Sequence, residues 1–226
     1  MSLKEEIKNE AAVEREKLKH MSFQDKLWYI WEYYKFHIAV VIGIIFILCI
    51  IGTSIYNSTI ENSLYCIIIN NQSNSEMNYD VLTRDFHDHM GFGKKQEVNA
   101  ESIYITYGDV VSEFSYASMA KISAMIASKE LDILITDKEN FDRYSTMNGY
   151  GDLEQILPED LLALLKDRLC YGTTEDGQTA AFAVDISRTA FTENMGISLE
   201  PAYCGFISNS QNTDTAIALL RYIFEQ

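Results

Sequence analysis

The stretch His37 to Tyr56, HIAVVIGIIFILCIIGTSIY, decides how this chain is organised, because it runs for 20 residues without a charged side chain. About 20 predominantly apolar residues are needed for a helix to cross the hydrocarbon core of a bilayer. Isoleucine, leucine, phenylalanine and valine each favour insertion by roughly 0.3–0.6 kcal/mol at the centre of such a helix. The stretch, framed by Lys35 and Glu61, therefore predicts one membrane-spanning helix over residues 37–56.

Two other interpretations of this apolar stretch compete with the membrane helix. A buried helix of a soluble protein usually keeps a polar face over this length, and none is visible here. A cleaved signal peptide has a short basic region before the apolar run and a small-x-small cleavage site after it. The segment before the run extends to Phe36, and Tyr56-Asn57-Ser58-Thr59 offers no such cleavage site. We therefore expect an uncleaved anchor.

The basic residues beside the helix predict its orientation. Lys26 and Lys35 lie just before the run, whereas the first basic residue after it is Arg84. Because positive charge is enriched on the cytoplasmic side of membrane helices, we expect a single-pass protein of the cell membrane with a cytoplasmic N-terminus. Residues from about 57 onward would then lie outside the cell.

Net charge also differs between the two sides of the apolar run. Residues 1–36 hold seven basic and seven acidic residues, which leaves 11 of the 18 basic and 26 of the 33 acidic residues, a net charge of −15, beyond them. This excess of negative charge disfavours nucleic acid and anionic lipid head groups as partners, and it favours cationic ligands or basic protein surfaces. Solubility alone is the other explanation of the charge.

The segment before the membrane run has two parts. Residues 1–21 read as a charged cytoplasmic arm, either a solvated helix or a disordered lead-in. Ser22 with Asp25 three residues later predicts the start of a juxtamembrane helix over residues 22–36. Its aromatic residues suit the depth of the lipid head groups, and a docking surface for another membrane subunit is the alternative. The expected interface anchors are Trp28, Tyr29, Trp31, Tyr33, Tyr34 and Lys35.

After a linker at 57–63, residues 64–226 show alternating strand and helix patterns typical of an α/β domain. The first three strands are separated by helices, a β-α-β-α-β order that predicts a mainly parallel sheet in a three-layer architecture. The expected strands are 64–69, 98–107, 131–136, 170–174, 179–186 and 202–208, with the fourth and fifth forming an antiparallel hairpin. The expected helices include one through Leu82, Phe86 and Met90, one at 114–129, a short one around Phe141, one at 158–169 and one at 213–224.

Three stretches of this region resemble one lobe of the type 2 solute-binding proteins of bacterial importers. They are KELDILITD at 129–137 followed by Phe141, GDLEQILP at 151–158, and YCGFISNS at 203–210. Only residues 187–202 stand where a second lobe would be inserted, and a domain needs about 50 residues or more, so we expect a single lobe. The anchor with its aromatic-rich helix is also similar to uncharacterised single-pass membrane proteins of clostridia-like Gram-positive bacteria.

The resemblance implies a ligand site where the strand ends meet. Ligands of open α/β sheets bind outside the carboxyl ends of the strands. Polar residues also occur at such positions merely to end strands and cap helices, so this alternative stays open. The candidate ligand-binding residues are Asn70, Asn71, Tyr107, Asp109, Asp137, Ser208 and Asn209.

Catalytic and metal-binding patterns are sparse. The dense cluster Asp85-Phe86-His87-Asp88-His89 places His87 and His89 on different sides of a helix, and only Asp85 and His89 share a face. A metal site there competes with the interpretation as a solvated helix face. Spacings typical of G-x-S-x-G, P-loop, H-E-x-x-H or EF-hand motifs do not occur. We therefore expect no enzyme activity, no cofactor and no metal.

The four cysteines do not form the pattern of a disulfide scaffold. Cys49 lies inside the membrane run, and Cys66, Cys170 and Cys204 show no C-x-x-C spacing. Cys66 and Cys204 fall in apolar strand-like stretches and are predicted to be buried thiols. One disulfide among the three outer cysteines remains an open alternative.

These patterns together predict a membrane-anchored extracytoplasmic module that binds a protein or peptide partner, as an accessory subunit of a transporter or envelope complex. The first alternative is a tethered small-molecule solute receptor or sensor. The second is an enzyme of unknown type, with Asp85 to His89 as its candidate cluster.

Overall fold

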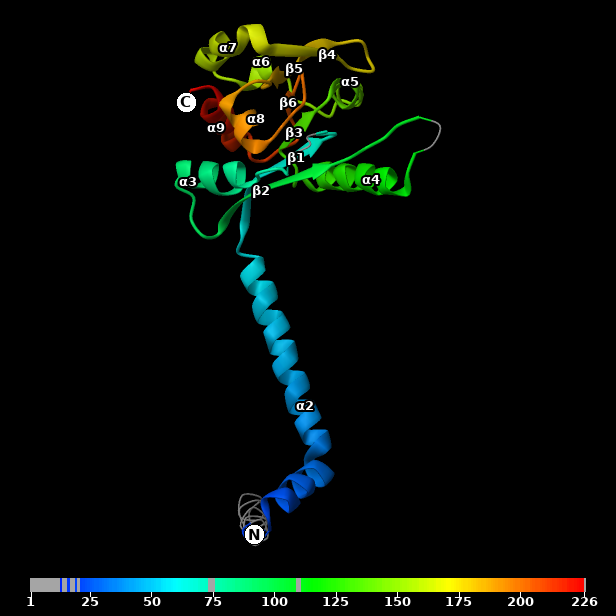
Figure 1. Cartoon of the computed structure of the whole chain (residues 1–226), viewed down its shortest axis with the longest axis vertical. Helices are drawn as coiled ribbons and strands as arrows, with labels where there is room; N and C mark the ends of the chain where they lie inside the picture. Colours follow the sequence, from blue (N-terminus) through cyan, green and yellow to red (C-terminus); the bar gives the residue numbers. More distant parts are fainter. Residues whose placement is uncertain are drawn as a thin grey trace. The chain divides into compact units, whose positions relative to one another are not determined.

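The computed structural model describes residues 13, 16, 19, 21–72, 76–108 and 111–225, so the arm predicted for residues 1–21 lies almost wholly outside the described residues. The chain divides into two units, Met1–Thr59 and Ile60–Gln226 (Figure 1). The first unit contains the long helix α2, and the second contains a six-stranded sheet with its helices.

Helix α2 (Phe23–Asn57) begins where the sequence predicts. The Ser22 side chain accepts a hydrogen bond from the Asp25 backbone N–H at 3.3 Å and donates one to the Asp25 carboxylate at 2.7 Å. The juxtamembrane helix predicted for 22–36 and the membrane helix predicted for 37–56 are two parts of this one continuous helix. No glycine or proline occurs between Phe23 and Ile42, so nothing in the sequence breaks the helix at that point.

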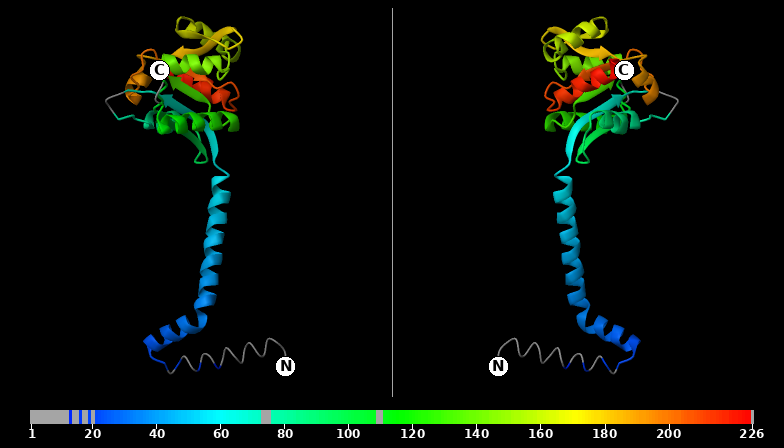
Figure 2. Two further views of the ribbon diagram at one scale, coloured as in Figure 1. Left: turned by 90° about the vertical axis from the view of Figure 1, so that its right-hand side faces the viewer. Right: turned by 90° about the vertical axis from the view of Figure 1, so that its left-hand side faces the viewer.

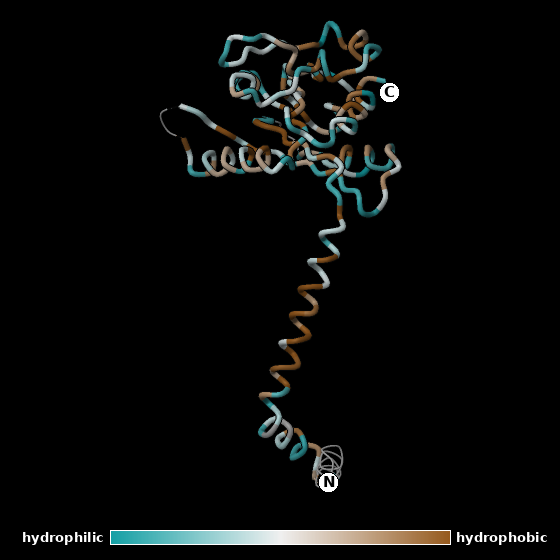
Figure 3. Tube along the Cα trace, turned by 180° about the vertical axis from the view of Figure 1, so that it is seen from behind, coloured by the Kyte–Doolittle hydropathy of each residue, from teal (hydrophilic) through white to brown (hydrophobic). Residues whose placement is uncertain are grey.

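Residues Tyr34–Asn57 of α2 form one helical stretch of 24 residues that is long and apolar enough to span a membrane. None of its most apolar part is buried within the described structure, and Figure 3 shows the same stretch as a nearly unbroken hydrophobic tube. The anchor candidates Trp28, Trp31 and Lys35 are exposed, while the Tyr33 side chain lies outside the described residues. The remaining two candidates, Tyr29 and Tyr34, lie on the same part of α2.

The sheet of the second unit combines parallel and antiparallel strands in the order β2-β1-β3-β6-β5-β4. β1 pairs in parallel with β2 and β3, whereas the β3–β6, β6–β5 and β5–β4 pairs are antiparallel. The strands are β1 (Glu61–Ile69), β2 (Gln96–Ile103), β3 (Ile133–Thr136), β4 (Leu169–Thr173), β5 (Thr179–Asp185) and β6 (Tyr203–Phe206).

The prediction of a mainly parallel sheet is wrong, and the position of β6 explains why. The connection from β5 to β6 contains only one short helix and returns to the sheet at the edge it left. β6 therefore enters the sheet antiparallel to both of its neighbours, β3 and β5. The predicted hairpin of β4 and β5 is confirmed.

The linker predicted at 57–63 is also shorter in the structure. α2 ends at Asn57 and β1 starts at Glu61, whose backbone N–H donates to the Lys95 carbonyl at 2.7 Å. The polar residues Glu61 and Asn62 thus belong to the strand, because their pairing with β2 continues beyond the apolar run that sequence patterns detect.

Helices cover both faces of the sheet. Apart from α2, they are η1 (Val81–Phe86), α3 (His87–His89), α4 (Glu113–Ser128), α5 (Lys138–Thr146), α6 (Leu153–Ile156), α7 (Glu159–Leu165), η2 (Lys166–Arg168), α8 (Ala190–Met195) and α9 (Thr213–Phe224). The predicted helix at 213–224 is confirmed, and the helix at 114–129 is confirmed within one residue at each end.

Two separate cores confirm the three-layer prediction. Alternate residues of β1 point to opposite faces, so that Cys66 and Ile68 join one core while Ile67 and Ile69 join the other. The first core is completed by η1, α6, α7, α8 and the C-terminal helix α9, red in Figure 2. The second core is completed by α4 and α5.

The described cysteines are all free thiols. Cys66 on β1 and Cys204 on β6 are both buried, as predicted, but β3 lies between their strands. Two strand spacings of about 4.8 Å separate such residues, and disulfides require Cα atoms within about 7 Å. The open alternative of a disulfide therefore fails for this pair.

Candidate functional site

One edge of the sheet collects the ends of four strands. β1, β2, β3 and β5 all end there, and β6 begins there, since Tyr203 is paired with both Thr136 and Asp185. We call this the carboxyl edge. Asn70 and Asp137 follow β1 and β3 directly, so these two sequence-predicted site residues lie together as expected.

Asn70 and Asp137 are joined by a hydrogen bond. The Asn70 amide nitrogen donates to Asp137 Oδ2 at 2.8 Å, while Asn70 Oδ1 accepts the backbone N–H of Ile105 at 2.8 Å. Asp137 Oδ1 accepts the backbone N–H of Asn140 at 2.9 Å and so caps α5. The polar atoms of both residues thus hold the strand ends and cap α5, which is the other role that polar residues have at such positions.

Tyr107 lies beside this pair and extends its hydrogen-bond network. The Tyr107 hydroxyl donates to Asn140 Oδ1 at 2.7 Å, and the Arg143 guanidinium carbon stands 3.9 Å from the centre of the Tyr107 ring. Burial raises the pKa of the Tyr107 hydroxyl, because the charged phenolate is poorly solvated there. The predicted site residue Asp109 lies outside the described residues.

Asn71 forms hydrogen bonds with a different part of the domain, the segment that follows α8. Its Oδ1 accepts hydrogen bonds from the Ser198 backbone N–H at 2.8 Å and from the Ser198 hydroxyl at 3.0 Å. Its amide nitrogen donates to the Gly196 carbonyl at 2.9 Å. Asn71 therefore fastens the end of β1 to the connection that follows α8.

The expectation that Ser208 and Asn209 join the same site is wrong. β6 runs antiparallel to β3, so its C-terminal end lies beside Ile133, at the edge opposite the carboxyl edge. There the Ser208 hydroxyl donates to the Asn148 carbonyl at 3.2 Å, and Asn209 donates to the Ile126 carbonyl at 2.8 Å.

The same opposite edge holds a buried carboxylate, Asp132. It accepts hydrogen bonds from the Tyr65 backbone N–H at 2.8 Å, the Ser210 hydroxyl at 2.6 Å and the Asn212 amide at 3.1 Å. Asp132 has no exposed surface. Because three donors from separate segments meet one fully buried anion, its role is to hold β1 and the start of α9 against β3.

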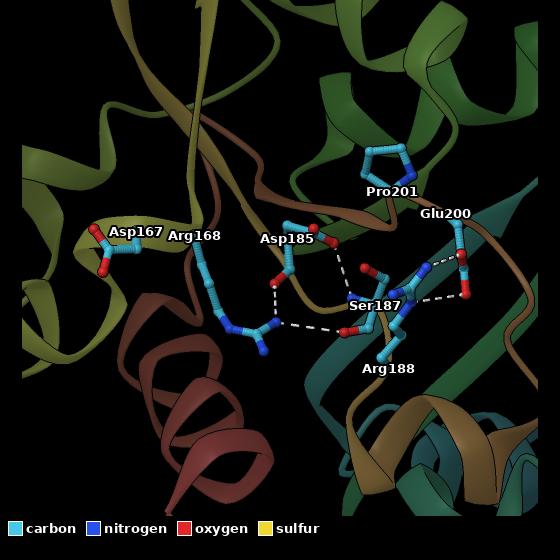
Figure 4. A pocket seen from close by; sticks show the side chains of 7 residues that line it. All are labelled: Asp167, Arg168, Asp185, Ser187, Arg188, Glu200 and Pro201. Carbon is cyan, nitrogen blue, oxygen red and sulfur yellow. Dashed lines mark hydrogen bonds and ion pairs between the residues drawn. The ribbon is translucent and has the colours of Figure 1, made fainter.

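Two cavities open along the carboxyl edge. The smaller, of about 330 Å³, is lined by Asn70, Gln72, Asp137, Lys138, Ser198, Leu199, Glu200 and Pro201. The larger, of about 590 Å³, is lined by Asp167, Arg168, Asp185, Ser187, Arg188, Glu200 and Pro201 (Figure 4). We call the larger one the Arg168 cavity. Their volumes fall within or near the range of small-molecule sites, about 300–1,000 Å³.

Sequence reasoning missed the residues of the Arg168 cavity. Arg168 falls inside the helix predicted for 158–169, where a basic residue near the C-terminal end is ordinary. Asp185 falls inside the strand predicted for 179–186. The predicted β4–β5 hairpin was the available signal, because it places Arg168 opposite Asp185, but no spacing links the two to Glu200.

The Asp85 to His89 cluster serves packing in the structure. His87 Nε2 lies 2.9 Å from the Gln96 carbonyl oxygen, and the His89 ring stands 5.0 Å from that of Tyr222. Asp85 pairs with Arg84 instead of His89. Among the described residues, no group of three or more His, Cys, Asp or Glu side chains is placed to hold a metal ion.

Helix α4 presents a second candidate surface, of a different kind. Its inner side, with Ile122 and Met125, is buried against the sheet. Its charged residues are Glu113 and Lys121, and Lys121 is paired with Glu101 of β2. We call its exposed side the α4 outer face, which consists of Glu113, Phe114, Tyr116, Ala117, Ala120, Lys121, Ser123, Ala124, Ala127 and Ser128.

Comparisons of the chain with protein-family models, with curated proteins and with solved structures give no match.

Proposed function

We propose that the chain is a membrane-anchored protein-binding module, and that its partner covers the α4 outer face. The observation that carries this proposal is the composition of α4. A surface helix normally turns a charged and polar face to water. The α4 outer face instead carries two charged residues, Glu113 and Lys121, of which Lys121 is paired with Glu101, and its other exposed residues are aromatic, alanine or serine. Only one side of α4 is buried within the domain.

The two aromatic residues at the start of α4 strengthen the case. Phe114 and Tyr116 are 64% and 62% exposed, next to a stripe of alanines that lets another backbone come close. Exposed aromatic residues beside small ones are typical of the centre of protein interfaces, where charged residues are depleted. The negative charge of the domain favours a partner with basic residues around its contact surface.

The membrane setting of this module is part of the same proposal. Lys26 and Lys35 support a cytoplasmic N-terminus, with the α/β domain outside the cell. The sequence resemblance to one lobe of a solute-binding protein supports a place beside a transporter or another envelope complex. Residues 187–202 form a short connection with α8, and the small size of this connection supports binding of a neighbouring protein over capture of a ligand between two lobes.

Photo-crosslinking tests the interface. A photoreactive phenylalanine analogue placed at Ala120, on the outer face of α4, is expected to trap the partner in native membranes as a discrete adduct. The same analogue at Ala163, an exposed alanine of α7, is the matched control and is expected to give no such adduct. An adduct of twice the chain's mass would identify the partner as a second copy.

A charge placed in the same face completes the test. Ala124→Arg is expected to abolish the adduct formed at position 120, whereas Ala163→Arg leaves it intact, with both variants melting at the temperature of the unsubstituted chain. Absence of an adduct at position 120, or equal adducts at 120 and 163, would contradict the proposal.

The two cavities at the carboxyl edge favour a second candidate function, a tethered receptor for a small solute. Small-molecule sites lie where the strands of α/β sheets end, and both cavities open there. This function and the α4 interface involve different residues, so one chain can perform both.

A further inference from the structure

The Arg168 cavity contains a guanidinium that lacks an anionic partner. Arg168 is half-buried, and its Nη1 donates to the backbone carbonyls of Asp185 at 3.0 Å and Ser187 at 3.4 Å. Its guanidinium carbon lies 5.2 Å from the centre of the Phe224 ring, which supports it from one side. Arg168 forms no ion pair with any residue that the structure describes, so its Nε and Nη2 donors remain for another acceptor.

Arg188, the other guanidinium of the cavity, is already neutralised. Its Nε and Nη2 donate to the two carboxylate oxygens of Glu200, at 3.2 and 2.7 Å. This fork-to-fork arrangement uses the donors that are best suited to a carboxylate. The two arginines of one cavity thus differ, because Arg188 has its carboxylate from the protein and Arg168 does not.

Two carboxylates of the cavity have spare acceptor capacity. Asp185 Oδ1 accepts the backbone N–H groups of Ser187 at 2.9 Å and Ala202 at 3.3 Å, while no hydrogen bond from a described residue reaches Asp185 Oδ2. Asp167 likewise receives no ion pair from the described part of the chain. Figure 4 shows Asp185 between Arg168 and the Arg188–Glu200 pair.

We propose that the Arg168 cavity binds a small zwitterion with one carboxylate and one ammonium group. The ligand carboxylate accepts from Nε and Nη2 of Arg168, and the ligand ammonium donates to Asp185, with Asp167 contributing negative charge. The proposal rests on the second candidate function, a solute receptor, and is independent of the α4 interface.

Charge decides between this ligand class and its alternatives. With Arg188 and Glu200 cancelling each other, one guanidinium faces two carboxylates. A dianion such as a phosphate monoester would meet too little positive charge, and a simple monoanion would leave both aspartates without a partner. A lone cation would leave Arg168 unpaired. A ligand with both charges pairs with Arg168 and Asp185 at once.

Isothermal titration of the full-length chain in lipid nanodiscs tests the proposal. The zwitterionic probes are glycine, 4-aminobutyrate and 6-aminohexanoate, which place the two charges at three separations. Butyrate and butylamine each carry one of the two charges, and O-phosphoethanolamine replaces the carboxylate with a phosphate. We expect at least one zwitterion to bind about tenfold or more tightly than butyrate, butylamine and O-phosphoethanolamine, since each missing charged hydrogen bond costs at least that factor.

Substitutions locate the site. Arg168→Gln and Asp185→Asn are expected to weaken binding of that zwitterion by about tenfold or more, because each removes one charge while keeping a polar side chain. Arg84→Gln is the control and is expected to leave the affinity unchanged, since it removes an exposed guanidinium that lies outside the cavity and pairs with Asp80 and Asp85. Unchanged binding in Arg168→Gln would overturn the assignment.

The probe series alone remains decisive if Arg168→Gln does not fold. Binding of none of the three zwitterions, or equal binding of butyrate and its zwitterionic counterpart, overturns the proposal in the unsubstituted chain. Tighter binding of O-phosphoethanolamine than of glycine, 4-aminobutyrate and 6-aminohexanoate would show that the cavity prefers a phosphate to a carboxylate. That result would refute the proposed ligand class. Failure here with an intact adduct at position 120 would refute the zwitterion assignment and leave the α4 interface standing.

Discussion

The amide nitrogen of Asn70 lies 2.8 Å from Asp137 Oδ2, so a side-chain hydrogen bond joins the end of β1 to the cap of α5. Asn70 also has a positive φ of 60°, a conformation that asparagine and glycine tolerate best. One residue thus meets two requirements, a left-handed backbone at the end of β1 and a polar link to the neighbouring strand.

Asn70→Ala is expected to reduce the free energy of unfolding by about 2–4 kcal/mol, because the Ile105 N–H and Asp137 lose a partner and alanine strains the backbone. Asn70→Gly loses the same hydrogen bonds without the strain and should be more stable than Asn70→Ala by about 1 kcal/mol. Urea denaturation of the chain in detergent micelles, followed by tyrosine near-ultraviolet circular dichroism, measures both. Equal stability of the two variants would contradict the strain argument.

Substitution of Asp132, at the opposite edge of the sheet, is expected to reduce the free energy of unfolding by a larger amount. Asp132→Ala leaves the Tyr65 N–H, the Ser210 hydroxyl and the Asn212 amide without their acceptor in a buried site, and we expect a loss of about 3 kcal/mol or more. Asp142→Ala removes an exposed carboxylate paired with Lys138 and should cost about 0–1 kcal/mol, which makes it the matched control. The same denaturation experiment compares them, and similar losses in the two variants would be inconsistent with a structural role for Asp132.

Because the thiol of Cys204 is buried, we expect the folded domain to lose stability in alkali. Burial raises the pKa of its thiol from the usual 9.0 to about 12. Between these values the unfolded chain has lost a proton that the folded chain still holds, so stability is complete below about pH 9 and falls as pH rises towards 12. The buried thiol of Cys66 and the hydroxyl of Tyr65, whose pKa rises to about 12, act in the same direction.

Cys204→Ala isolates the contribution of this thiol. The variant loses some packing at every pH, but its stability should fall less steeply than that of the unsubstituted chain between pH 9 and 12. Thermal melting at half-unit pH steps in micelles gives both curves. Parallel curves over this range would show that Cys204 does not ionise on unfolding.

The proposed orientation predicts which positions are accessible from outside the cell. Single cysteines are placed at Ser2 and at Asp176, an exposed residue between β4 and β5, in a background with Cys170→Ser. An impermeant thiol reagent on intact cells should label position 176 and spare position 2, with labelling at both positions after lysis. The reverse pattern would place the α/β domain in the cytoplasm and remove the proposed setting.

The apolar patterns of the sequence locate most elements but not the direction of the last strand. Buried runs such as Ile67 to Ile69 are apolar on both faces, and this marks a strand between two layers of helices. The run around Cys204 has the same character in either direction. Only the short return through α8 makes β6 antiparallel, and a connection of that length carries no local signal for direction.

The direction of β6 decides how much of the candidate site could be predicted from the sequence. Asn70 and Asp137 follow parallel neighbours, so their proximity was predictable from strand order. Ser208 and Asn209 were assigned to the wrong edge because their strand is reversed. Arg168 and Asp185 lie at the open end of the predicted β4–β5 hairpin, where Leu169 pairs with Val184. Glu200 reaches them only because β6 pairs with β5, an arrangement that residue spacing does not encode.

The place of β6 between β3 and β5 has a consequence for synthesis of the protein. The last strand that the ribosome supplies is the one that joins the two halves of the sheet, β2-β1-β3 and β5-β4. A product interrupted before Tyr203 leaves the inner edges of β3 and β5 open, with rows of unpaired backbone groups that invite pairing with other chains. Incomplete translation products should therefore aggregate, and the cell must either finish the chain or degrade it.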